Sequence, residues 1–364
     1  MKHKNKLILV IGLTSLTVLT ILLFIIFCFR RKKAENGSKI LESSIEYEKR
    51  DGLVNSEKFI KFQNGDDLTV HEILDAPGEV IGKSSYGTLY KASLVNSHSL
   101  ALLRFLRPTC TLRTKEVVPI VELLGSIRHP NLVPLNAFYA GLRGEILMVH
   151  PFYGLGNLAQ FIKGKVCADN NGEARKWPVI YKISIGIAKG VHHLHSSFDK
   201  PLIHGNLKSK NILLDRHYNP YVLDFGLHLL LNPTMAQQML ETSASQGYKA
   251  PEMIKMKDAS EESDIYSLGV IFLELLTGKL SIDEKFSRDQ DFDLPSALRS
   301  VILDDRITGF YHPDILLGLS DDRRVITEDR ILKFFQLAMA CCSPFRFLRP
   351  DIRQILEKLQ EIGK

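Results

Sequence analysis

The stretch that decides the fold is His204-Gly205-Asn206-Leu207-Lys208-Ser209-Lys210-Asn211, followed further along the chain by Asp224-Phe225-Gly226. Two other segments frame it: Ile127-Arg128-His129-Pro130-Asn131-Leu132-Val133-Pro134-Leu135 upstream and Gly247-Tyr248-Lys249-Ala250-Pro251-Glu252 downstream. Each segment alone is a weak signal, because short motifs also occur by chance. Their order and spacing together predict a single fold.

These ordered motifs make residues 67–362 similar to the plant leucine-rich-repeat receptor-like kinases, and most similar to the catalytically degenerate, transmembrane kinase-like branch. The resemblance implies an α+β, bilobal protein-kinase-like fold with a small β-rich lobe and a large α-helical lobe. The patterning agrees, because a strand-like run at Ser99–Leu106 comes early. Helical stripes of apolar residues at 180–194 and 352–362 come late.

The loop at 204–211 keeps the kinase pattern but lacks the residues that carry out the reaction. A working kinase reads H-R-D-L-x-x-x-N there, and its Asp accepts the proton of the substrate hydroxyl. Asn206 stands at the Asp position, and a neutral amide cannot accept that proton. Gly205 stands at the Arg position, so no guanidinium is present to bind a phosphorylated activation loop.

The residues that grip the phosphates are missing as well. The family reads V-A-x-K on the third strand, and aligning Leu100-Ala101-Leu102-Leu103 with it puts Leu103 at the Lys position. Arg104 is adjacent, but its guanidinium is expected to face away unless a bulge intervenes, because consecutive strand side chains point to opposite faces. Ile120 stands where the family has the Glu that pairs with the Lys. An apolar contact between Leu103 and Ile120 is therefore predicted in place of that ion pair.

Parts of a nucleotide and metal site persist. Asn211 and Asp224 match the Mg²⁺ ligands of the family. The glycine-rich loop is present, although Ser84 replaces its middle glycine and narrows the approach of backbone N–H groups to phosphate. The candidate nucleotide-binding residues are Gly82, Gly87, Leu89, Ala101, Pro151, Tyr153 and Leu213. Their alternative role is ordinary core packing. No cofactor is required, and ATP with Mg²⁺ is the candidate ligand.

Residues that stabilise the large lobe are also in place. The resemblance implies a buried ion pair between Glu252 and Arg349, and it makes Asp264 the cap of the catalytic-loop backbone. Phe225 and His204 match members of a stack of side chains that joins the two lobes. His204 is therefore interpreted as a packing residue rather than an acid–base catalyst.

The N-terminal region predicts a membrane anchor. Residues 7–29 contain no charge, and 23 residues of helix exceed the ~30 Å hydrocarbon core of a bilayer. The alternative is a cleaved signal peptide, but the apolar run is longer than usual and the basic residues 30–33 follow it. The expected organisation is a short extracytoplasmic tail at 1–6, a transmembrane helix at 7–29, a basic stop and juxtamembrane linker at 30–66, and a cytoplasmic kinase-like domain at 67–362. The repeat ectodomain of the family is expected to be absent.

Basic residues are concentrated beside that predicted span. The chain has 47 Lys and Arg against 41 Asp and Glu, and seven of the basic residues lie within residues 1–33, where there is no acid. The remainder holds 40 basic against 41 acidic residues, so the charge gives no support to nucleic-acid binding. The five cysteines have the spacing of neither a disulfide framework nor a zinc site.

The function expected from these observations is a pseudokinase anchored by a single pass in the plasma membrane, acting as a scaffold or co-receptor for active receptor-like kinases. The alternative is an unconventional or weak Ser/Thr kinase that binds ATP and Mg²⁺. A third possibility is a scaffold that uses ATP as a structural ligand. Loss of the base costs ~10²–10⁴ in rate and loss of the Lys ~10²–10³, which favours the first interpretation.

Overall fold

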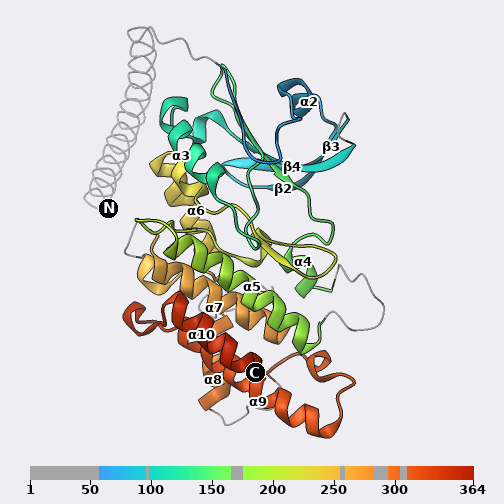
Figure 1. Ribbon diagram of the computed structural model, residues 1–364. Helices are drawn as coiled ribbons and strands as arrows, with labels where there is room; N and C mark the ends of the chain where they lie inside the picture. The colour runs from blue at the N-terminus through green and yellow to red at the C-terminus, as the bar shows by residue number, and fades with distance from the viewer. Residues whose placement is uncertain (1–56, 96–97, 165–174, 255–258, 282–293, 304–309) are drawn as a thin grey trace, which may run out of the picture. The chain divides into compact units, whose positions relative to one another are not determined.

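The computed structural model describes residues 57–95, 98–164, 175–254, 259–281, 294–303 and 310–364 (Figure 1). The predicted tail at 1–6, the span at 7–29 and the first part of the linker lie outside the described residues. Among the helices that are described, none combines the length and the apolar character needed to cross a membrane.

The small lobe is built on an antiparallel sheet with the strand order β1-β5-β6-β4-β3-β2. Its strands are β1 (Lys58–Lys61), β2 (Gly78–Lys83), β3 (Gly87–Leu94), β4 (Ser99–Leu106), β5 (Ala137–Ala140) and β6 (Ile146–Pro151). The short helix α2 (Val70–Leu74) lies on the outer face of the sheet, and α3 (Thr114–Ser126) packs on the opposite face. Because both faces are covered, β4 reads as an almost continuous apolar run.

The large lobe is mainly helical. Its helices are α4 (Leu158–Ile162), α5 (Trp177–Ser196), α6 (Pro233–Ser245), α7 (Glu261–Thr277), α8 (Leu294–Leu303), α9 (Asp321–Cys341) and α10 (Ile352–Gly363). A two-stranded sheet of β7 (Ile212–Leu214) and β8 (Pro220–Val222) lies beside the catalytic loop. Short 3-10 turns occupy Pro108–Cys110, Ser209–Asn211, Leu227–Leu230, Pro251–Ile254, Pro313–Leu316 and Arg346–Leu348.

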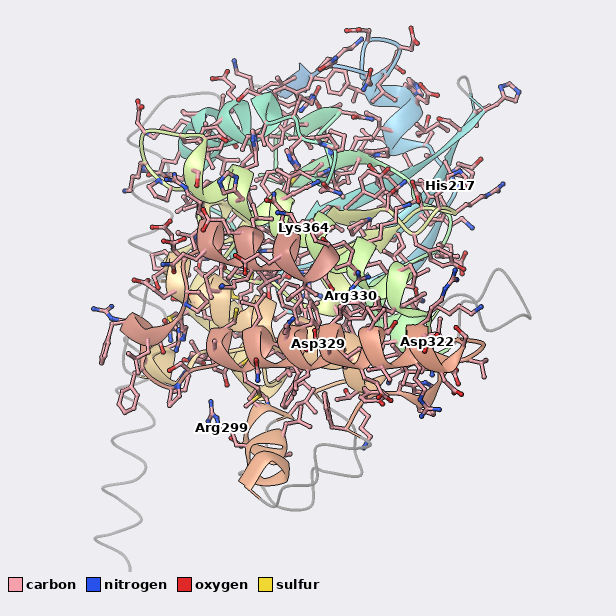
Figure 2. The ribbon with its side chains drawn as sticks, turned by 60° about the horizontal axis from the view of Figure 1, so that its bottom comes forward. His217, Arg299, Asp322, Asp329, Arg330 and Lys364 are labelled. Carbon is pink, nitrogen blue, oxygen red and sulfur yellow. The ribbon has the colours of Figure 1, made fainter. Side chains whose placement is uncertain are left out.

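The helical stripes explain how this lobe packs. Each turn of α5 from Ile180 to Leu194 buries an aliphatic residue, and α10 buries Ile352, Ile355, Leu359 and Ile362 in the same core. The helix α9 crosses the base of the lobe and presents Asp322 and Asp329 to solvent (Figure 2). The predicted bilobal kinase-like fold is therefore confirmed for the described part of the chain.

Candidate functional site

A buried ion pair joins the small lobe to the large lobe. Arg104 in β4 donates from Nε to Oδ1 of Asp224 at 3.2 Å and from Nη2 to Oδ2. The two side chains are only 7% and 2% exposed. Asp224 is the candidate Mg²⁺ ligand, so a protein cation already neutralises the carboxylate that a metal needs. A metal ion must displace a buried, two-point ion pair to bind there.

The predicted register of β4 is wrong by one residue. Leu103 pairs with Tyr90 and Val149 without a bulge, and its side chain packs in the cluster on the outer face of the sheet. Arg104 therefore faces the cleft and stands at the position of the phosphate-gripping Lys. One signal could have revealed this, because Arg104 is the only charged residue of β4. A charge in a strand buried on both faces requires a partner.

The predicted contact between Leu103 and Ile120 is wrong for the same reason. Ile120 lies on α3, is half-buried and packs against the main core on the other face of the sheet. It offers no carboxylate to a cation in the cleft, and Arg104 pairs with Asp224 instead. The ion pair that orients the helix in active kinases has thus been replaced by a pair between β4 and the segment that contains Asp224.

Three leucines pack together in the region where the adenine contacts were predicted. Leu89 of β3, Leu102 of β4 and Leu213 of β7 belong to one buried cluster and are 9%, 1% and 7% exposed. Leu102 stands where the family has a small Ala that leaves room for the base, once the register is corrected. The apolar contacts that a bound purine makes in a kinase are made here between side chains of the two lobes.

The other predicted adenine contacts are placed differently. Ala101 lies on the outer face with Leu103, so its predicted role in the slot is wrong. Pro151 pairs with Ala101 in the β4–β6 ladder. The ring of Tyr153 stacks on Tyr221, with ring centroids 4.0 Å apart, at the edge of the leucine cluster.

The glycine-rich loop folds a tyrosine into the cleft. Gly82 and Gly87 flank this loop, and a Cβ on Gly87 would lie 2.1 Å from the carbonyl oxygen of Phe105, so only glycine fits there. Tyr86 between them is only 6% exposed. Burial raises the pKa of its hydroxyl, to which the Asp224 carboxylate adds, whereas Arg104 lowers it. The hydroxyl of Tyr86 is therefore within electrostatic range of both members of the ion pair.

The residue at the catalytic-base position is bound within the chain. Asn206 is 2% exposed, and its Oδ1 accepts a hydrogen bond from Oγ of Ser243 at 2.6 Å. Ser243 belongs to α6, in the segment that follows Asp224. Asn211, the second candidate metal ligand, is buried and donates from Nδ2 to the Asn206 carbonyl at 2.9 Å. Burial lowers the pKa of nearby Lys208 to about 8, and Asp224 opposes that shift.

The backbone conformation of the catalytic loop favours glycine at position 205. Its φ is +74°, a left-handed conformation, and a Cβ there would lie 2.7 Å from Nδ1 of His228. The N–H groups of His204 and Gly205 donate to the two carboxylate oxygens of Asp264 at 2.7 and 3.0 Å. Asp264 is 1% exposed and thus caps the catalytic loop from the start of α7.

The remaining predicted structural residues are buried and paired. Phe225 and His204 are 8% and 0% exposed, and Nε2 of His204 lies 3.1 Å from the Leu223 carbonyl. Arg349 donates to both carboxylate oxygens of Glu252, at 2.6 and 2.7 Å. These contacts join the turn after the activation segment to the start of α10, as in an intact large lobe.

Sequence reasoning did not single out a buried glutamate beneath the catalytic loop. Glu274 of α7 is 0% exposed and accepts hydrogen bonds from the hydroxyls of Ser209 and Tyr248 and from the N–H of Ser281. Burial raises its pKa to about 7, and these hydrogen bonds oppose the shift. The cluster ties the catalytic loop to the segment around Tyr248 without touching the cleft.

Comparisons with known proteins show the family of this chain. The protein kinase domain model matches residues 76–357. The putative kinase-like protein TMKL1 of Arabidopsis thaliana is 34% identical over 97% of this chain and 52% of its own length. The chain spans about half the length of the curated relatives it matches.

Two solved structures are similar over most of the described domain. The maize SIRK1 (sucrose-induced receptor kinase 1) kinase domain bound to AMP-PNP gives a TM-score of 0.71 at 28% identity, covering 84% of this chain and 100% of that one. The pseudokinase domain of BIR2, an immune regulator of the RLK/Pelle family, gives 0.64 at 26% identity, covering 82% and 83%.

Proposed function

The chain belongs to the protein kinase family, and we propose that within it this protein is a receptor-like pseudokinase that acts as a signalling scaffold or co-receptor for active receptor-like kinases. The observation that carries the proposal is the buried pair of Arg104 and Asp224. In this pair, the cation at the phosphate-binding position and the carboxylate at the metal-ligand position neutralise each other's charge. Neither is then available to a nucleotide.

The chemistry of the cleft disfavours phosphotransfer by two independent routes. Asn206 supplies no base, which costs ~10²–10⁴ in rate, and its amide oxygen already accepts from Ser243. Loss of the electrostatic clamp on the phosphates costs ~10²–10³ more by analogy with an oxyanion donor. Although such effects are not additive, they leave very little of the ~1–100 s⁻¹ of a typical kinase. A weak Ser/Thr kinase is therefore the less favoured function.

The proposal includes the anchor that the sequence predicts. Residues 7–29 would hold the protein in the plasma membrane, and the basic residues 30–33 would keep the kinase-like domain in the cytoplasm. A domain that is folded and catalytically silent at this place can contact the kinase domains of active receptors. It would then contribute to signalling by binding partners through its surface and not by catalysing a reaction.

The experiment that tests the proposal separates catalysis from binding. The purified full chain is incubated with labelled ATP and Mg²⁺, alone and with the kinase domain of an active receptor-like kinase. We expect no label from the chain alone and a concentration-dependent change in the partner's phosphotransfer. Label that forms in the chain alone and disappears in an Asp224→Ala variant contradicts the proposal, as does an active partner that never responds.

A further inference from the structure

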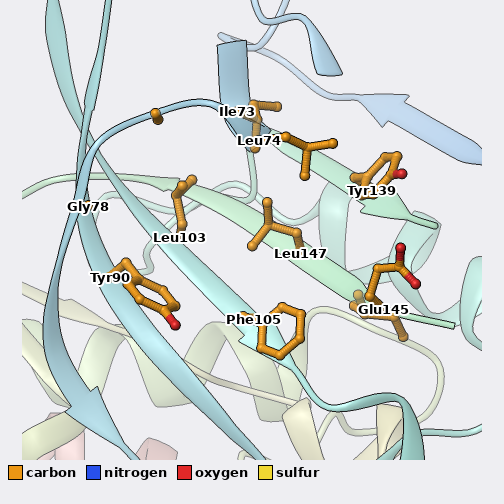
Figure 3. Close-up of a pocket in the computed structure, with 11 residues that line it drawn as sticks. Ile73, Leu74, Gly78, Tyr90, Leu103, Phe105, Tyr139, Glu145 and Leu147 are labelled. Carbon is orange, nitrogen blue, oxygen red and sulfur yellow. The ribbon is translucent and has the colours of Figure 1, made fainter. Parts of the chain in front are cut away.

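The outer face of the small-lobe sheet contains an apolar cavity. Its volume is about 310 Å³, and it lies between α2 and the strands β3, β4 and β6 (Figure 3). The floor is formed by Leu103, Phe105 and Leu147, with Tyr90 at one side and Tyr139 at the other. Because an apolar cavity of about 150 Å³ holds one benzene ring, this cavity has room for about two rings of that size.

The cavity opens to solvent beside an acidic side chain. Leu74 of α2 lines the cavity and is 53% exposed. Glu145, immediately before β6, lies beside Tyr139 in the lining (Figure 3). Its carboxylate accepts the N–H of Arg143 at 3.0 Å and forms no ion pair within the described residues. An occupant that fits this cavity is therefore apolar and carries a positive charge next to its apolar part.

The large lobe presents a group of this kind at the turn between α9 and α10. Phe345 and Phe347 are 58% and 78% exposed, and their ring centroids are 5.9 Å apart. Leu348 beside them is 61% exposed. These three residues are called the aromatic knob below. Arg346 stands between the two phenylalanines and is exposed as well. Neighbouring exposed aromatic side chains of this sort are typical of interaction surfaces.

The turn that carries the aromatic knob is held by the large lobe. The N–H of Phe345 donates to Oγ of Ser343 at 3.3 Å, and the N–H of Leu348 donates to the carbonyl of Phe345 at 3.0 Å. The next residue, Arg349, is bound at two points by the carboxylate of Glu252. The rings are therefore presented in a fixed arrangement, which lowers the entropy lost when they bind.

The aromatic knob and the cavity match in size and in charge. The knob offers two aromatic rings to a cavity with room for about two, and aromatic side chains line that cavity. Arg346 brings a positive charge to the side of the cavity where Glu145 lies. The knob belongs to the large lobe and the cavity to the outer face of the small lobe (Figure 1), so the two cannot meet within one folded domain.

We propose that the aromatic knob of one copy of this chain binds in the small-lobe cavity of a second copy. The contact joins two different surfaces, so copies associate head to tail, in a row or in a ring. Only a few side chains are buried, which places the contact among the weak and transient interfaces. The proposal goes beyond the proposed function and does not depend on whether the cleft binds nucleotide.

Mixing two defective variants tests the contact in the full chain. Donor-labelled and acceptor-labelled copies are reconstituted in liposomes at a fixed protein-to-lipid ratio, and energy transfer between them is measured. Phe347→Asp disables the knob and keeps the cavity, whereas the double variant Leu74→Lys, Glu145→Lys disables the cavity and keeps the knob. Each variant alone should associate at least tenfold more weakly than wild type. A mixture of the two should recover at least half of the wild-type signal, because one knob and one cavity remain intact.

The matched control is Val325→Asp, because Val325 on α9 is 67% exposed and belongs to neither the knob nor the cavity. This variant should associate as the wild type does. Knob or cavity variants that associate as well as the control overturn the proposal. A mixture that recovers no signal also overturns it, because mixing restores only a contact between two different surfaces.

Photo-cross-linking gives an independent check of the placement, with a variant that keeps the knob aromatic. A full chain with Phe347→p-benzoylphenylalanine is mixed in the same liposomes with wild-type chain labelled with heavy isotopes, and the linked peptides are mapped by mass spectrometry. We expect links to peptides of the heavy chain that contain the cavity residues Tyr90 or Phe105. Links that run mainly to lipid, or to other parts of the heavy chain, contradict the proposal.

Discussion

The guanidinium of Arg104 and the carboxylate of Asp224 form a two-point ion pair inside the cleft, with Nε 3.2 Å from Oδ1. In an active kinase the corresponding cation holds phosphate and the corresponding carboxylate holds Mg²⁺. Here each is the partner of the other. The pair therefore satisfies both charges within the chain, although its components match those of a kinase nucleotide site.

We expect Arg104→Met to destabilise the domain by about 3–5 kcal/mol, because Asp224 is left buried without a partner. The matched control is the double variant Arg104→Met, Asp224→Asn, in which no charge remains and much of the stability should return. Urea unfolding of both variants measures the difference. A single variant that is as stable as the double variant would show that the pair is unimportant.

We expect wild-type protein to bind no adenosine, and Leu102→Ala to gain measurable binding. The smaller side chain opens the slot between Leu89 and Leu213, although removing a buried leucine itself costs about 2–5 kcal/mol. Calorimetric titration with adenosine tests the slot without involving the phosphate or metal positions. Leu103→Ala is the control, because that side chain lies on the outer face. Binding to wild type equal to that of Leu102→Ala would contradict the filled slot.

Asn206→Asp alone should not restore phosphotransfer. The new carboxylate would still face Ser243, Asp224 would remain paired with Arg104, and Leu102 would still fill the slot. Labelled ATP with a peptide substrate measures the activity. A variant that combines Leu102→Ala, Arg104→Lys, Ile120→Glu and Asn206→Asp opens the adenine site and restores the phosphate-binding Lys, the Glu that pairs with it and the catalytic base. Only this combination is expected to give activity above a blank. Robust activity of the single variant would refute the argument.

Glu274 should make the domain less stable as the pH rises from about 5 to 8. Its pKa is raised to about 7 in the folded chain, above the 4.5 of an unfolded one, so the folded state holds its proton longer. The stabilisation is complete below pH 4.5 and is lost as pH passes 7, a change on the order of 3 kcal/mol.

Burial lowers the pKa of His150 to about 4, which produces the opposite trend below pH 6.5. The quantity to measure is therefore the difference between wild type and Glu274→Gln in urea unfolding at several pH values. This difference should change steadily between pH 5 and 8. A constant difference would show that Glu274 stays ionised.

The kinase-like domain should be on the cytoplasmic side of the membrane. Seven basic residues and no acid flank the predicted span at 7–29, four of them on its C-terminal side. Protease treatment of sealed microsomes should digest the domain while a lumenal marker survives, and detergent should expose both. A protected domain would reverse the predicted orientation.

The motifs predicted the fold and the missing base, because ordered polar residues at fixed spacing are visible in a sequence. Which side chains of β4 lie on which face of the sheet was not predictable in the same way. Both faces of this strand are buried, so its alternation of apolar and polar residues is absent, and only the charge of Arg104 distinguishes the face of Leu102 from that of Leu103. A slip of one residue then exchanged Arg104 with Leu103.

The contacts of the cleft were also beyond sequence patterns. Tyr86 could equally point to solvent from a glycine-rich loop, and Ser243 reaches Asn206 only because the segment after Asp224 folds into α6. Such long-range contacts depend on the tertiary path of the chain.

The leucine cluster of the slot has a consequence for the cell. Because Leu89, Leu102 and Leu213 join the lobes by themselves, their closure does not depend on the supply of adenine nucleotide. Under the proposed function, the surface offered to a partner is then the same at low and at high concentrations of adenine nucleotide. Under the proposed function, its signal then depends on how much of the protein is present and not on the energy state of the cell.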